Sequence, residues 1–124
     1  MSDSFSFSGR IRSVKHALCG LGEVISSQHN AWIHLVVSIV VCVTGILFGI
    51  TKIEWCVLIL TMVGVWAAEA LNTAFEFLCD VASPDFHPLV KKSKDIAAGA
   101  VLLSAIGAVF IGLIVFTPYV AKYL

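Results

Sequence analysis

The chain has 124 residues, of which 59% are apolar and only 13% charged, and its mean hydropathy is +0.97. Soluble domains are typically about 45–50% apolar and about 25% charged, so this composition disfavours a water-soluble monomer and favours a small integral membrane protein. Eight Lys and Arg residues balance eight Asp and Glu residues, which excludes the strongly basic surface of a nucleic-acid-binding protein.

The first predicted element is an amphipathic helix over residues 7–27. Its apolar residues recur at steps of three and four, which is the spacing of one helix face. Three basic residues in the same segment, Arg10, Arg12 and Lys15, can contact phosphate headgroups. We therefore expect this helix to lie on the membrane surface. The apolar residues are Ile11, Val14, Leu18, Leu21 and Ile25.

Three apolar stretches follow, each near the roughly 20 residues that a helix needs to cross a bilayer. They cover residues 32–50, 55–78 and 96–116. Helices are expected because a bilayer requires backbone hydrogen bonds to be satisfied within the segment. Pro118, which follows Thr117, is expected to end the third stretch, and the segment SPDFHP is expected to form the turn before it. The sequence thus predicts an all-α membrane protein with a single domain, residues 1–124.

The basic residues indicate the orientation in the membrane. Six of the eight precede the first span or lie between the second and third, and two lie on the other side. Because cytoplasmic loops are enriched in Lys and Arg, we expect the N-terminus and the second loop to be cytoplasmic. The six are Arg10, Arg12, Lys15, Lys91, Lys92 and Lys94, and the two are Lys52 and Lys122.

A stripe of polar residues runs along the second span, in the segment EALNTAFEFLCD. At about 100° per residue, Glu69, Asn72, Glu76 and Asp80 share one helix face about 80° wide. An ionisable group at mid-bilayer costs on the order of 2.5–3.5 kcal/mol, so such groups are rarely accidental. Several carboxylates on one face require protonation, a cation or a paired base.

This stripe favours phosphoryl transfer at the membrane surface. Mg²⁺ binds carboxylate oxygens together with phosphate, and Lys91, Lys92 and Lys94 stand just after the turn, where they can contact phosphates. The pattern indicates transfer of a phosphoryl group from Mg-ATP to a lipid hydroxyl. A small oligomeric transporter with Glu69 as a proton relay stays open as an alternative. His34 and His87 are expected to be an interfacial and a loop histidine.

The segment EALNTAFEFLCD closely resembles the signature of the prokaryotic diacylglycerol kinase family, Glu-x-x-Asn-Thr/Ser-Ala-x-Glu-x-x-x-Asp. The following SPDFHPLVKKSKDIAAGAVLL resembles that family's next block, and the resemblance extends from about Arg10 to Pro118. It implies a small lipid kinase of the bacterial inner membrane that forms a homotrimer with active sites at subunit boundaries. The implied substrates are Mg-ATP and a lipid alcohol, either diacylglycerol or undecaprenol.

The resemblance also implies roles for individual residues. Glu69 would be the general base on the lipid hydroxyl, Asn72 would orient groups around the reacting centre, and Glu76 would hold Mg²⁺. The residues implied in nucleotide binding are Asp80, His87, Lys94 and Asp95.

The N-terminal half departs from the family pattern. Gln28 stands where the family commonly has a glutamate that shares the metal with Glu76, and Trp32 stands where an arginine is common. The N-terminal arginine that family members use near the site corresponds to Arg10 or Arg12. A catalytically silent relative, which would bind Mg-ATP poorly, is a second alternative.

Overall fold

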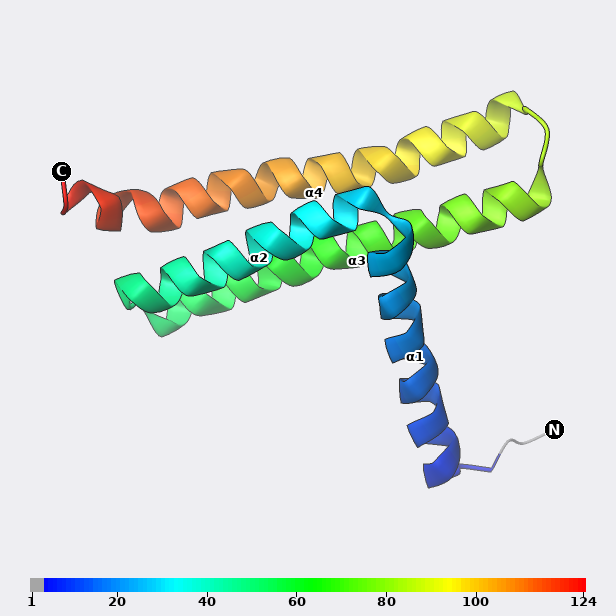
Figure 1. Ribbon diagram of the computed structural model, residues 1–124, viewed down its shortest axis with the longest axis horizontal. Helices are drawn as coiled ribbons and strands as arrows, with labels where there is room; N and C mark the ends of the chain where they lie inside the picture. Colours follow the sequence, from blue (N-terminus) through cyan, green and yellow to red (C-terminus); the bar gives the residue numbers. More distant parts are fainter. Residues whose placement is uncertain (1–3) are drawn as a thin grey trace.

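The structure is a computed structural model that describes residues 4–124, and every regular element in that range is a helix. This confirms the predicted all-α class. In Figure 1 the helices α2, α3 and α4 lie side by side, and α1 leaves them at a steep angle. The helices are α1 (Phe7–Ser27), α2 (His29–Phe48), α3 (Lys52–Ala82) and α4 (Pro88–Ala121).

The helices α2, α3 and α4 are each long and apolar enough to cross a membrane. At about 1.5 Å per residue, the 31 residues of α3 are roughly 46 Å long. This exceeds the approximately 30 Å of a bilayer's hydrocarbon core. One end of α3, which carries the polar stripe, can therefore reach from the hydrocarbon region to the headgroups.

The third apolar helix is longer at both ends than the sequence predicts. It begins at Pro88, so the lysine-rich segment lies on its first turns, and it continues through Pro118 to Ala121. Proline in a helix removes one hydrogen bond and crowds the preceding turn. Contacts of the last turn offset this cost, because the Tyr119 hydroxyl donates to Glu54 Oε1 at 2.5 Å and the Tyr119 ring stacks on Phe48 with centroids 5.8 Å apart.

Local hydrogen bonds fix where the helices begin. Thr51 and Glu54 form a capping box at the start of α3, in which Thr51 Oγ1 accepts from Glu54 N at 3.2 Å and Glu54 Oε1 accepts from Thr51 N at 3.1 Å. Residues 51–54, which separate the first two predicted spans, thereby form the start of a helix. The preceding helix, α2, ends at Phe48 because Gly49 adopts the left-handed conformation, with φ 61°.

The best-packed region lies at the end of the bundle away from the polar stripe. Ile50, Leu58 and Val115 form a buried cluster there. The helices α2 and α3 approach closely at Gly45, where an added Cβ would lie 2.7 Å from the Trp55 ring. This contact holds the hairpin of α2 and α3 and thereby sets which residues of the two helices face each other further along.

Helix α1 contacts α2 and α3 and buries only Val24. Its predicted apolar face is exposed in the single chain. An apolar face without a protein partner fits a helix that lies on a membrane surface.

Candidate functional site

The polar stripe of α3 runs from the interior of the bundle to its exposed end. Glu69 and Asn72 are only 1% and 7% exposed, and Thr73 beside them is also buried. Glu76 is half-buried, and Asp80 is exposed. The stripe therefore joins a buried carboxylate to a surface that water can reach.

Glu69 lies in a small cavity of about 210 Å³ between α2, α3 and α4. Neither of its carboxylate oxygens has a hydrogen-bond partner, and the same is true of Asn72 Oδ1. The nearest basic atom is His34 Nε2, 3.4 Å from Glu69 Oε2. Leaving a buried polar atom unpaired costs about 1–3 kcal/mol, so these atoms are typical of a site that binds a polar group of a ligand.

Gln28 and Glu76, the two candidate metal ligands, lie together. Gln28 is the single residue between α1 and α2, and its Nε2 donates to Glu76 Oε2 at 2.9 Å. Within residues 4–124, no group of three or more His, Cys, Asp or Glu side chains could hold a metal ion. The donors present fit Mg²⁺, which is often bound through one or two carboxylates and the phosphates of a substrate.

The candidate nucleotide-binding residues lie where α3 and α4 meet at the turn. Lys94 Nζ donates to Asp80 Oδ1 at 2.9 Å and so joins the two helices. Asp95 instead accepts from Lys91 Nζ at 2.7 Å within α4. Both pairs are largely exposed, and exposed ion pairs contribute about 0–1 kcal/mol. Their lysines can therefore exchange a carboxylate for a phosphate at little cost.

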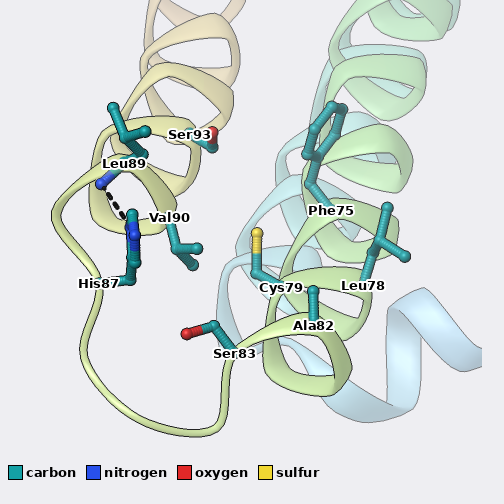
Figure 2. Close-up of a pocket in the computed structure, with 9 residues that line it drawn as sticks. All are labelled: Phe75, Leu78, Cys79, Ala82, Ser83, His87, Leu89, Val90 and Ser93. Carbon is teal, nitrogen blue, oxygen red and sulfur yellow. Dashed lines mark hydrogen bonds between the residues drawn. The ribbon is translucent and has the colours of Figure 1, made fainter.

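His87 lies on the rim of a pocket of about 380 Å³ at this turn (Figure 2). Its Nδ1 accepts from the backbone N–H of Leu89 at 3.2 Å, so His87 caps the N-terminus of α4. Only its Nε2 is left to contact a ligand. The pocket is lined by Phe75, Leu78, Cys79, Ala82, Ser83, His87, Leu89, Val90 and Ser93.

The single chain does not bring Arg10 and Arg12 to the stripe. Both are exposed on the first turns of α1, which point away from the other helices in Figure 1. The Arg10 guanidinium lies over the Phe5 ring, 5.5 Å from its centroid. Trp32, at the start of α2, is likewise exposed.

His34 is the residue that the sequence analysis missed, because it was expected to be an interfacial histidine. A usable signal was the register of the hairpin. In two antiparallel helices, residues equally far from the connecting turn lie at the same level, and His34 and Glu69 are almost equally far from the turn around Thr51. The same register brings Gln28 and Glu76 to about the same level.

Three helices that are long and apolar enough to cross a membrane, together with a buried carboxylate at the head of a polar stripe, indicate a membrane protein with a functional site inside its helix bundle. The family model of the prokaryotic diacylglycerol kinases matches residues 15–116. The chain belongs to the prokaryotic diacylglycerol kinase family, and so to the lipid kinases.

Individual relatives cover most of the chain. It is 36% identical to the undecaprenol kinase of Bacillus subtilis over 107 residues. This alignment covers 86% of this chain and 87% of that protein. It is 39% identical to a diacylglycerol kinase of Synechocystis over 101 residues, and this alignment covers 81% of this chain and 58% of that protein. A diacylglycerol kinase of Helicobacter pylori is 32% identical over 87 residues, 68% of this chain and 67% of that protein.

Proposed function

We propose that the protein transfers the γ-phosphoryl group of Mg-ATP to the hydroxyl of a membrane lipid alcohol, diacylglycerol or undecaprenol. The observation that carries this proposal is Glu69, a buried carboxylate without a hydrogen bond, at the inner end of a stripe that leads to the exposed Asp80–Lys94 pair. The names of the relatives support the choice of acceptors.

In this reaction Glu69 is the general base. The hydroxyl oxygen of the lipid bonds to the γ-phosphorus, the bond from that phosphorus to the ADP oxygen breaks, and Glu69 accepts the hydroxyl proton. Asn72, one turn away, presents an unpaired Oδ1 that can accept a hydrogen bond and orient the hydroxyl. A lipid hydroxyl arrives from the hydrocarbon side, which is the side on which Glu69 is buried.

Gln28 and Glu76 hold the metal. Bound Mg²⁺ supplies positive charge that stabilises the phosphate oxygens. In the structure Gln28 turns its Nε2 toward Glu76, so its amide must rotate to offer Oε1 as a ligand. Lys94 and Asp95 contact the nucleotide at the exposed end, with His87 Nε2 beside them.

The site faces the cytoplasm, because it lies on the side of the protein that carries the lysine-rich first turns of α4 and the basic helix α1. Cytoplasmic segments of membrane proteins are enriched in Lys and Arg. The enzyme works as a homotrimer in the bacterial inner membrane. The number of subunits follows the family resemblance, and one feature supports an assembly of subunits: Arg10 and Arg12 lie away from the stripe of their own chain. A neighbouring subunit can supply the missing half of the site.

The test is transfer of ³²P from labelled ATP by the purified protein in lipid, with diacylglycerol and undecaprenol offered side by side and Mg²⁺ varied. We expect label in one of the two lipids and none without Mg²⁺. Absence of label in both lipids, with the protein folded and oligomeric, would contradict the proposal. Proton-coupled flux in the same vesicles would then favour the transporter.

A further inference from the structure

His34 of α2 contacts the candidate general base on α3. The distance from His34 Nε2 to Glu69 Oε2 is 3.4 Å, and the Glu69 side chain is 1% exposed while that of His34 is 16% exposed. The carboxylate has no hydrogen bond from any described residue. Catalytic hydrogen bonds are often long before the substrate binds and shorten in the complex. His34 is therefore placed to bond to Glu69 once the lipid hydroxyl is present.

Trp66 and Ser38 limit the orientation of the His34 ring. The indole of Trp66 meets the imidazole edge-on, with ring centroids 6.1 Å apart and an interplanar angle of 66°. Trp66 Nε1 donates to Ser38 Oγ at 3.1 Å, and Ser38 Oγ donates to the backbone carbonyl of His34 at 2.7 Å. The indole is thus attached to the helix turn that carries His34, which keeps the imidazole facing Glu69.

His34 also lies between Glu69 and the outside of the bundle. It lines both the cavity of about 210 Å³ that contains Glu69 and an apolar groove of about 310 Å³ between α2, α3 and α4. Among the residues that line the Glu69 cavity, only His34 and Glu69 have ionisable side chains. The other lining residues are Asn30 and Ile33 from α2, Asn72 from α3, and Ala98, Val101, Leu102 and Ala105 from α4.

We propose that His34 is a positioning residue for Glu69: its Nε2–H donates a hydrogen bond to the carboxylate once the lipid hydroxyl is present and so orients the carboxylate toward that hydroxyl. This inference rests on the proposed function. The oxygen–phosphorus bond forms, the bond to ADP breaks with its electron pair on ADP, and the hydroxyl proton goes to Glu69.

The first test compares the wild type, His34→Ala and Glu69→Gln in lipid, with and without added imidazole. We expect His34→Ala to lower kcat by about 10²-fold and to leave the KM for Mg-ATP unchanged, because the nucleotide residues lie at the other end of the stripe. Imidazole in the vacated space should restore a large part of the rate of His34→Ala and nothing of Glu69→Gln.

The matched control is His16→Ala, since His16 is exposed on α1. It should retain the wild-type rate with no effect of imidazole. A His34→Ala enzyme with unchanged kcat would overturn the proposal, and so would a loss that imidazole does not restore.

A second measurement needs no turnover and stands even where His34→Ala fails to fold. The chain has four histidines, so ¹⁵N-histidine labelling gives few ring signals, and His34→Gln identifies the one of interest. We expect the His34 ring signals to shift in Glu69→Gln, with those of His16 and His87 unchanged; an unmoved His34 signal overturns the inference. An inactive wild type would instead refute the proposed function, and the NMR comparison would still decide whether the two side chains interact.

Discussion

Glu69 combines deep burial with an ionisable group, and this combination fits its proposed role as the general base. A carboxylate that is 1% exposed and has no hydrogen bond is unfavourable in a resting protein. The cost is offset when the group accepts a proton from a hydroxyl that arrives beside it. Burial also excludes water, which would otherwise compete with the lipid for the phosphoryl group.

Replacing Glu69 with glutamine removes the base and preserves the shape of the side chain. We expect Glu69→Gln to lower kcat by roughly 10²–10⁴-fold and to leave Mg-ATP binding intact, because the nucleotide residues lie further along α3. Titration with a fluorescent ATP analogue measures binding, and ³²P transfer measures turnover. Asp85→Asn, in the exposed turn, is a matched control that should retain full activity. Loss of binding together with turnover would make Glu69 a metal ligand instead.

Gln28 offers a test of the metal site, because an amide stands where the family pattern has a carboxylate. We expect Gln28→Glu to lower the Mg²⁺ concentration needed for half-maximal rate, since a second carboxylate attracts the cation. Without Mg²⁺ the same change places two carboxylates together and should lower the thermal unfolding midpoint. Glu76→Gln should shift the Mg²⁺ titration in the opposite direction. Unchanged Mg²⁺ titrations in both variants would remove this pair from the metal site.

Among the elements, the apolar helices are the part of the fold that the sequence predicts best. Their length and lack of charge reflect a single strong requirement, the satisfaction of backbone hydrogen bonds in lipid. The ends are harder to predict because side-chain contacts decide them. The capping box at Thr51 extends α3 toward its N-terminus, and the contacts of Tyr119 carry α4 past Pro118.

Helical periodicity predicts the candidate site only within one helix, whereas the lysine-rich segment and the family resemblance add Lys94 and Gln28, and neither indicates His34. The stripe from Glu69 to Asp80 follows from helical periodicity alone. The partners of that stripe come from other helices: His34 from α2, Gln28 from the joint between α1 and α2, and Lys94 from α4. Their positions depend on the register of the hairpins, which the packing of the opposite end determines.

The effect of this packing on the register of the hairpin can be tested at Gly45, where α2 and α3 approach closely. We expect Gly45→Ala to destabilise the protein by about 1–3 kcal/mol, because the new methyl group would lie 2.7 Å from the Trp55 ring and must displace it. Gly107→Ala is the control, since nothing lies within 4 Å of the Cβ it would add. Unfolding in mixed micelles measures both. Equal stability of the two variants would show that the helices do not approach closely at Gly45.

At the scale of the whole molecule, the charges and the helices together predict the topology. The start of α3 and the start of α4 lie at opposite ends of the bundle in Figure 1. In a variant without native cysteines, we expect Lys52→Cys to react with a membrane-impermeant maleimide on intact cells. Lys92→Cys should react only after the membrane is permeabilised. The reverse pattern would place the phosphoryl-transfer site outside the cell, away from ATP.

The length of α3 has a consequence for which alcohols can be accepted. Glu69 and Asp80 belong to one uninterrupted helix, so they are separated by a fixed height of roughly 16 Å. To reach Glu69, an acceptor must place its hydroxyl deeper in the membrane than the nucleotide, by much of this distance. A lipid whose hydroxyl sits directly on the hydrocarbon chain or on a bare glycerol loses little hydration in doing so. A phospholipid would have to strip water from a charged phosphate, so under the proposed function the depth of Glu69 would protect the bulk membrane lipids from modification.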